Sequence, residues 1–266
     1  MAKHLPVVMI HGAFCGGWSF AGWRALYEAR GFDVHTPDLR HHTSHEEAQR
    51  SLGGVSIRDY CADISALLDR FDSLPVVVGH SLGGLVAQML AAKGRIRALI
   101  LLAPLSPWGM FPSTPFEWMS MQALYLEGAF WKKVLSPRRR LAAAHALERV
   151  PEELHRAILK RLVPESGLAL FEAMHWFLDP HKATLVEPRA VTCPILCIAG
   201  ACDRIVSATT ARRVARRYGG RARCEILRDH GHWLHGEPGW ERIARGSLAW
   251  LDQVLDRDSE RVRGGR

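Results

Sequence analysis

The sequence predicts an α/β protein with a mostly parallel central sheet, helices on both faces and an inserted helical cap. Short apolar runs alternate with segments of helical length, which is typical of parallel strands covered on both sides. One of these runs leads directly into Gly-x-Ser-x-Gly and then into a helix-compatible segment. About ninety residues separate the fourth and fifth apolar runs, far more than a single crossover helix requires.

Six segments are predicted as strands because they are short and rich in β-branched or other apolar residues. In order along the chain they are Val7–Ile10, Phe32–Pro37, Val76–Gly79, Leu99–Ala103, Ile195–Ala199 and Cys224–Leu227. Helices fit between and after them, with apolar residues on one stripe. These helices are Trp18–Arg30, Ser56–Phe71, a segment after Ser81 that ends near Gly94, and Trp240–Val254.

The long interval between strands predicts a helical cap over residues 105–188, inserted into a core made of residues 1–104 and 189–256. Residues 257–266 have no apolar periodicity, so we expect this tail to fray. The cap is rich in Trp, Phe and Met, most of which must pack it on the core. We expect an apolar substrate pocket, since ligand sites are mainly apolar, lined by Phe14, Trp108, Trp118, Met119, Trp176 and Trp233.

The composition excludes several classes of protein. With 266 residues, 48% of them hydrophobic, the chain can bury one large core. No run of about eighteen apolar residues exists, and the N-terminus lacks the layout of a signal peptide, so we expect a cytoplasmic protein without a membrane partner. The formal charge of +8 is spread over several basic clusters, which favours solvated faces over a nucleic-acid interface.

Neither the cysteines nor the clustered histidines predict a metal site. Six cysteines are scattered through a chain too long to depend on disulfides, so buried free thiols are expected. Cys193 and Cys197 would share one face of a strand without forming a metal-binding turn. The His-His-x-x-His pattern at residues 41–45 is better explained by a solvated loop or by side chains at a pocket rim.

The strongest motif is the pentapeptide around Ser81. A serine projected from a strand-to-helix turn has strained backbone angles, and side chains two residues to either side would collide. Gly79 and Gly83 avoid that collision, and the β-branched run before them supplies the strand. The order strand, Gly-x-Ser-x-Gly, helix predicts a nucleophile elbow with Ser81 as the nucleophile.

A serine hydroxyl needs a base and a group that orients the base. Asp203 follows a predicted strand, at the end where open α/β sheets place their sites, and is the expected acid. His232 follows Gly231 and completes the order Ser, Asp, His that serine hydrolases of this fold share, so it is the expected base. The alternatives left open are His230 and His235 as bases, and Asp229 and Asp179 as acids.

The negative charge that develops on the substrate oxygen needs hydrogen-bond donors. The N–H of Leu82, directly after the nucleophile, is one expected donor. The second should come from the loop after the first long strand, where the N–H of Ala13 is favoured.

At these motifs the chain resembles the α/β-hydrolase family, over nearly its whole length and loosely only in the cap. The resemblance rests on His11-Gly12-Ala13, the Gly79–Gly83 pentapeptide, Gly200–Asp203 and Gly231-His232. Residues 11–18 are especially similar to the branch of plant methylesterases and hydroxynitrile lyases. The resemblance implies an ester-hydrolysing triad of Ser81, Asp203 and His232, oxyanion donors at Ala13 and Leu82, and no cofactor.

Two departures disfavour other reactions of related enzymes. The lyases of that branch carry a threonine where this chain has Gly12, and a lysine where Trp233 stands. Epoxide hydrolases and haloalkane dehalogenases resemble the same fold but use an aspartate nucleophile, which Ser81 replaces here.

We therefore expect a serine carboxylesterase that acts through an acyl-enzyme on small to medium apolar esters, including oligoesters. Its partner would be a small-molecule ester, and the protein a monomer or homodimer. Hydrolysis of a thioester, a lactone or a carbon-carbon bond would use the same triad, and pocket shape alone separates these reactions. A ligand receptor built on a hydrolase fold is a further alternative, which would bind with little sustained product release.

Overall fold

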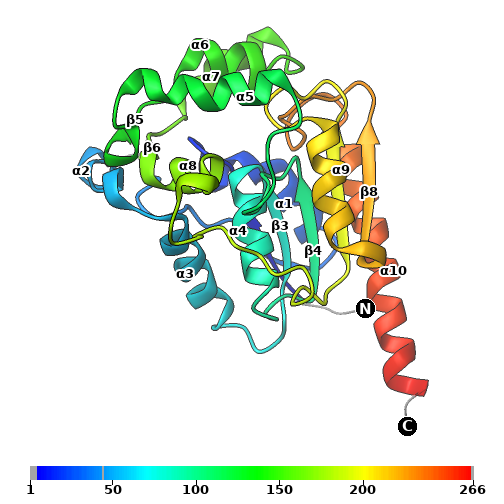
Figure 1. Cartoon of the computed structure of the whole chain (residues 1–266). Coiled ribbons are helices and arrows are strands. Elements are labelled where there is room, and N and C mark those ends of the chain that lie inside the picture. Colours follow the sequence, from blue (N-terminus) through cyan, green and yellow to red (C-terminus); the bar gives the residue numbers. More distant parts are fainter. Residues whose placement is uncertain (1–4, 44, 265–266) are drawn as a thin grey trace.

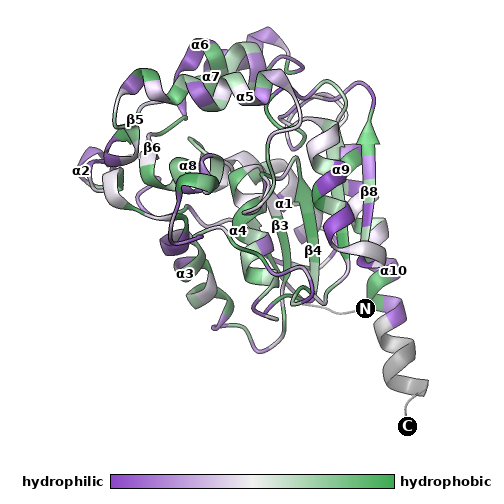
Figure 2. Ribbon diagram, viewed as in Figure 1, coloured by the Kyte–Doolittle hydropathy of each residue, from purple (hydrophilic) through white to green (hydrophobic). Residues whose placement is uncertain are grey.

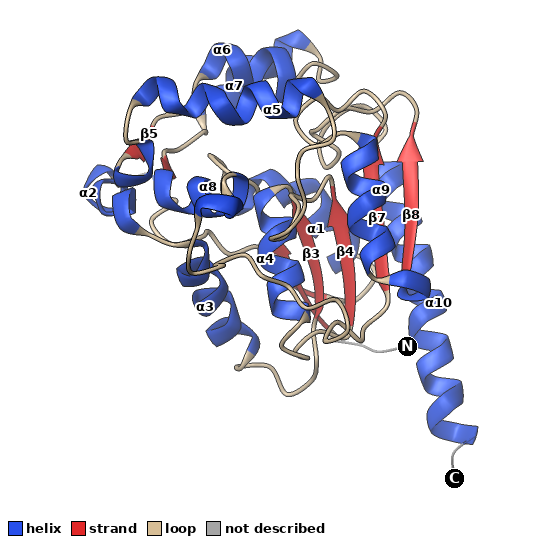
Figure 3. Ribbon diagram, viewed as in Figure 1, coloured by secondary structure: helices blue, strands red, loops and turns tan. Residues whose placement is uncertain are grey.

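The computed structural model describes residues 5–43 and 45–264, with side chains described through residue 257. Within these ranges six strands form one parallel sheet in the order β2-β1-β3-β4-β7-β8. Figure 3 shows β3, β4, β7 and β8 of this sheet in red. The strands are β1 (Pro6–Ile10), β2 (Asp33–His35), β3 (Val76–His80), β4 (Ala98–Leu102), β7 (Ile195–Gly200) and β8 (Ala222–Leu227). The predicted α/β fold class with a parallel sheet is thereby confirmed.

The apolar character of each strand follows its position in the sheet. Every residue of β1, β3, β4 and β7 is buried, because helices cover both faces of these inner strands. Figure 2 shows β3 and β4 in the green of hydrophobic residues, whereas β8 has both purple and green parts. Strand β8 lies at the sheet edge and is only partly buried, which explains its mixed composition.

Alternate residues of β1 pack into two separate hydrophobic cores, because successive side chains of a strand point to opposite faces of the sheet. Val7 and Met9 pack with α1 (Ala21–Glu28) and α10 (Trp240–Gly264) on one face. Val8 and Ile10 pack with the helices of the other face, which are α3 (Ile57–Leu68), α4 (Leu82–Ala91) and α9 (Ala208–Arg217). Both layers can be followed in Figure 1.

The segment between β4 and β7 lies over the carboxyl ends of the strands (Figure 1). It is mainly helical, and it also contains a small antiparallel sheet of β5 (Val134–Leu135) and β6 (Glu165–Ser166). Its α- and π-helices are α5 (Pro115–Gln122), α6 (Arg139–Leu141), the π-helix Ala142–Ala146, α7 (Glu152–Lys160) and α8 (Gly167–Met174). Short 3-10 helices at Ala123–Glu127, Phe130–Lys132 and Trp176–Leu178 complete it. We call this segment the cap.

Some elements differ from the sequence-based expectation. Helix α9 was not predicted, and neither were α2 (Glu46–Arg50) and the 3-10 helices Ser51–Gly54 and Gly219–Arg221. The predicted first helix is split into a 3-10 turn, Gly17–Phe20, and α1. The backbone of α10 is helical to Gly264, ten residues past the predicted end of this helix, and residues 265–266 lie outside the described ranges. None of the described helices is long and apolar enough to cross a membrane.

Candidate active site

Ser81 occupies the sharp turn between β3 and α4 with backbone angles of φ 52° and ψ −116°. A Cβ on Gly79 would lie 2.5 Å from the carbonyl oxygen of Gly83 and 2.7 Å from Gly84 Cα. A Cβ on Gly83 would collide with the carbonyl oxygens of Ile10 and His11. These are backbone contacts that cannot move aside, so the turn that carries Ser81 requires glycine at both positions.

Asp203 and His232 meet at the carboxyl ends of β7 and β8. His232 Nδ1 lies 2.8 Å from Asp203 Oδ2, and the aspartate side chain is completely buried. The other oxygen, Oδ1, accepts hydrogen bonds from the N–H groups of Ile205 (2.8 Å) and Val206 (2.9 Å). The carboxylate is therefore fixed, and its bond to Nδ1 leaves Nε2 of His232 as the ring nitrogen for proton transfer.

The rival acids and bases have other surroundings. His230 Nδ1 lies 3.5 Å from Glu237 Oε1, and His235 stacks on Phe20 with ring centroids 4.9 Å apart. The carboxylate of Asp179 accepts the N–H groups of His181 and Ala183, and Asp229 is exposed to solvent. Of the three candidate histidines, His232 is the one with a hydrogen bond to a carboxylate.

Ser81 and His232 line one cavity of about 820 Å³ that is bounded by both the core and the cap. No hydrogen bond joins the two side chains in the described part of the chain; they share the cavity. Of the predicted pocket residues, Phe14, Met119, Trp176 and Trp233 line it.

Trp108 and Trp118 do not line the cavity, so these two expectations are corrected. Trp108 packs against Trp176 with ring centroids 5.0 Å apart, and the Lys182 ammonium lies 4.8 Å from its ring centroid. Trp118 is 37% exposed and stacks on Phe111.

Sequence reasoning missed most of the cap side chains that line the cavity, because amphipathic spacing does not say which face of a short helix meets a ligand. They include Met110, Phe116, Met121, Leu124, Leu135, His145, Leu147, Ile158, Leu162 and Met174.

The two expected oxyanion donors occupy different surroundings. Ala13 lines the cavity, and Leu82 is completely buried at the first position of α4. Within the described residues neither N–H has a protein acceptor. A Cβ on Gly12 would lie 2.9 Å from His80 Nδ1 and 3.2 Å from Ser81 Cβ, so the loop approaches the nucleophile closely.

The histidines at residues 41–45 do not form a metal site. His42 is buried, and its Nε2 lies 2.9 Å from the carboxylate of Glu165, so the expected solvated loop is wrong for this side chain. Within the described ranges no cluster of three or more His, Cys, Asp or Glu side chains could hold a metal ion, and all six cysteines are free. The contact between His42 and Glu165 was missed because no sequence pattern connects residues so far apart.

Comparison with known proteins indicates the family of this chain. The model of the alpha/beta hydrolase family matches residues 7–245. A pyrethroid hydrolase of Sphingobium wenxiniae is 34% identical over 111 residues, which are 41% of this chain and 39% of that protein. Salicylic acid-binding protein 2 of Nicotiana tabacum is 32% identical over 109 residues, which are 40% of each protein. The aligned part thus spans about two fifths of the length of these curated relatives.

Among solved structures, a methylesterase from Arabidopsis has a TM-score of 0.69 and 19% sequence identity. The match covers 95% of this chain and 99% of that chain. At this level of identity the likeness concerns the fold.

Proposed function

The chain belongs to the α/β-hydrolase family, and we propose that it is a serine carboxylesterase in which Ser81, His232 and Asp203 form the catalytic triad. One observation carries the proposal. The imidazole of His232 is held by a 2.8 Å hydrogen bond to the buried Asp203. It lines the same cavity as Ser81, which lies on a strained strand-to-helix turn. This combination of nucleophile, base and orienting acid is what acyl transfer by serine requires.

In the first half of the reaction, Ser81 Oγ attacks the ester carbonyl carbon while His232 Nε2 takes the hydroxyl proton. The tetrahedral intermediate then collapses, and His232 returns that proton to the departing alcohol, which leaves Ser81 esterified to the acyl group. In the second half, His232 takes a proton from water as the water attacks the acyl-enzyme. The acid is released, and the proton returns to Ser81. Asp203 stabilises the imidazolium that forms in each half.

The N–H groups of Ala13 and Leu82 are the proposed donors to the oxygen that becomes negative in both tetrahedral intermediates. Both are free of protein acceptors within the described residues, and one of them lies at the N-terminus of α4, where backbone dipoles favour negative charge. A Cβ on Gly12 would lie 2.9 Å from His80 Nδ1 and 3.2 Å from Ser81 Cβ, so the threonine typical of related hydroxynitrile lyases would require these side chains to shift. That contact favours ester hydrolysis over cyanohydrin cleavage.

The cavity supports apolar esters of medium size as substrates. Its volume of about 820 Å³ lies in the upper part of the range of about 300–1,000 Å³ for ligand pockets. Four methionines and two aromatic side chains of the cap are among its lining residues, and Met adapts to irregular shapes. The name of the relative from Sphingobium wenxiniae refers to pyrethroids, and we propose that this chain likewise hydrolyses bulky apolar esters.

The test is the release of p-nitrophenol from acetate through decanoate esters by the native protein and by Ser81→Ala. We expect turnover with a chain-length optimum in the native protein, and a loss of at least about 1,000-fold in the variant, because the nucleophile is gone. Native protein that is folded but no faster than Ser81→Ala would overturn the carboxylesterase proposal. Stable binding of an ester without product release would then indicate a receptor.

A further inference from the structure

A buried charged pair joins the cap to the core beside the active site. Glu165 on β6 and His42 in the loop after β2 both have side chains without solvent exposure, and His42 Nε2 lies 2.9 Å from Glu165 Oε2. The other ring nitrogen of His42 donates to the carbonyl oxygen of Arg40 at 3.1 Å. Both nitrogens of His42 face acceptors, a geometry that favours an imidazolium with Glu165 as its carboxylate partner.

Glu165 also accepts three other hydrogen bonds. The Tyr60 hydroxyl donates to Oε1 at 2.6 Å, and the N–H of Ser166 donates to the same oxygen at 2.7 Å. The N–H of Phe14 donates to Oε2 at 3.3 Å. The carboxylate thus receives donors on both oxygens, and Phe14 is the residue next to the proposed oxyanion donor Ala13.

The backbone of Phe14 needs this support. Its φ of 60° lies in the left-handed region, which costs a non-glycine residue about 1–2 kcal/mol. The cap holds Phe14 from both sides of the residue: Glu165 accepts from its N–H, and the N–H of Val163 donates to its carbonyl oxygen at 3.1 Å. Two hydrogen bonds from one short cap segment therefore fix the strained residue that follows Ala13.

We propose that Glu165, paired with His42, is a positioning residue. From its place in the cap, it keeps the N–H of Ala13 oriented toward the oxyanion. This inference rests on the proposed function, since it assigns Glu165 a part in the same acyl transfer. Glu165 does not line the cavity and acts through Phe14. Phe14 itself lines the cavity, but a displaced oxyanion donor acts on the transition state, so kcat should fall by more than KM changes.

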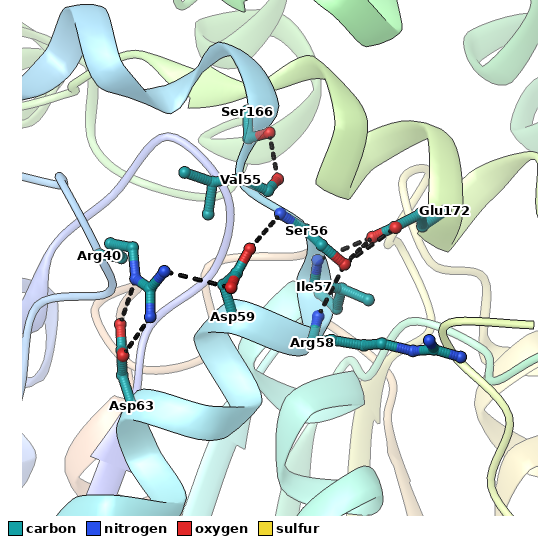
Figure 4. A network of polar contacts seen from close by, with 9 residues as sticks. All are labelled: Arg40, Val55, Ser56, Ile57, Arg58, Asp59, Asp63, Ser166 and Glu172. Atoms are coloured by element: carbon teal, nitrogen blue, oxygen red, sulfur yellow. Dashed lines mark hydrogen bonds and ion pairs between the residues drawn. The ribbon is translucent and has the colours of Figure 1, made fainter. Parts of the chain in front are cut away.

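A second buried cap carboxylate provides a matched control. Glu172 on α8 accepts the Ser56 hydroxyl (2.8 and 2.9 Å) and the N–H of Ile57 (2.8 Å), as Figure 4 shows. These partners lie at the N-terminus of α3 and belong to the core. Glu172 therefore ties the cap to the core as Glu165 does, without touching the oxyanion loop.

The experiment compares Glu165→Gln with Glu172→Ala. In Glu165→Gln a single amide oxygen replaces the two carboxylate oxygens that now face four donors, so Phe14 must compete with His42, Tyr60 and Ser166 for one acceptor. We expect kcat to fall by about 10-fold or more, with KM within about 2-fold of the native value. Glu172→Ala loosens the cap elsewhere and should lower the thermal unfolding midpoint while kcat stays within about 2-fold. Equal losses of kcat in both variants, or none in folded Glu165→Gln, would overturn the proposal.

A second readout separates this inference from the proposed function. A fluorophosphonate probe labels an activated serine without requiring an ester substrate, and its phosphoryl oxygen occupies the oxyanion position. We expect Glu165→Gln to slow labelling of Ser81 by about 10-fold, and Glu172→Ala to leave it unchanged. If native protein labels at Ser81 but hydrolyses no ester, the proposed function fails while the labelling rates still test Glu165. If it neither labels nor hydrolyses, both proposals fail.

If Glu165→Gln does not fold, Tyr60→Phe is the variant that tests the proposal in its place. It removes the 2.6 Å hydrogen bond to Glu165 and keeps the ring that packs in the core. A smaller fall in kcat and in labelling rate, of about 3-fold at unchanged KM, is expected. Native values of both rates in this variant would contradict the proposal.

Discussion

Three histidines near the proposed triad are held neutral by their surroundings. Burial, followed by the neighbouring His42, lowers the pKa of His11 to about 3. Burial and then His232 lower the pKa of His235 to about 3, and burial together with His235 lowers that of His80 well below its usual value. As neutral rings, His80 donates through Nε2 to the carbonyl oxygen of His232 (2.9 Å), and His11 donates through Nδ1 to that of Gly12 (2.8 Å). The hydrogen bonds of His80 and His11 fix the backbone of the site without adding charge to it.

The variant Asp203→Asn tests the role of the acid. The carbonyl oxygen of the introduced amide can still accept the N–H groups of Ile205 and Val206, so the loop should keep its shape. His232 loses the carboxylate that selects its tautomer and stabilises its cation, and kcat should fall by about 10³- to 10⁴-fold. Steady-state kinetics on p-nitrophenyl butyrate measures this loss. The control is Asp229→Asn, which changes an exposed residue one position before His230 and should retain native activity. Equal activity of the two variants would contradict the assignment of Asp203.

At the scale of elements, the close backbone packing around the turn at Ser81 predicts a large effect of Gly79→Ala on the free energy of unfolding. Gly79→Ala places a Cβ 2.5 Å from one backbone oxygen and 2.7 Å from a backbone Cα, and neither can rotate away. We expect the free energy of unfolding to fall by at least about 2 kcal/mol. Gly246→Ala, at an exposed site inside α10 with open space around it, should instead raise it by about 0.4–1 kcal/mol. Urea unfolding measures both, and equal effects would show that the turn tolerates a side chain.

The elements predicted well from sequence are those whose pattern has a local physical cause. The inner strands are continuous apolar runs because both of their faces are buried, and the turn at Ser81 needs its glycines because backbone lies against them. Asp203 and His232 were expected to lie near each other because each follows a strand at the same end of the sheet, and His232 Nδ1 lies 2.8 Å from Asp203 Oδ2. The prediction that Trp108 and Trp118 line the cavity was wrong because a cap of short helices has no single repeating apolar face. Whether an aromatic side chain of the cap points into the cavity depends on partners such as Phe111 that lie on other elements.

For the whole molecule, the cap is anchored by buried carboxylates at points that matter for the site. Glu117 on α5 accepts the N–H of Ser207 at 2.7 Å, four residues after Asp203. Glu172 holds the N-terminus of α3, and Glu165 holds Phe14. The cap thus contacts both the loop of the proposed acid and the loop of the proposed oxyanion donor, which no sequence pattern predicts because every partner is distant along the chain.

The pair of His42 and Glu165 predicts a pH window for this anchoring. Burial lowers the pKa of His42, but the charge and hydrogen bond of Glu165 outweigh it, so the pKa of His42 lies above its usual value of about 6.5. Burial likewise raises the pKa of Glu165, but the charge of His42 and hydrogen bonds from His42, Tyr60 and Ser166 leave it below its usual value. Asp38 adds to the rise for His42, and the facing His11 is neutral.

The signs of these shifts define where the pair stabilises the fold. A raised pKa of His42 contributes stability that is complete below about pH 6.5 and is lost as pH rises through the folded-state pKa. A lowered pKa of Glu165 contributes stability that is present above about pH 4.5 and is lost as pH falls through its folded-state pKa. Removing one partner of a buried ion pair typically costs about 3–5 kcal/mol. The difference in free energy of unfolding between native protein and Glu165→Gln should therefore be largest between about pH 5 and 6.5, and should shrink at higher pH as His42 loses its proton. Urea unfolding from about pH 5 to 9, followed by tryptophan fluorescence, measures this difference, and a value independent of pH would show that the pair is not charged in the folded protein.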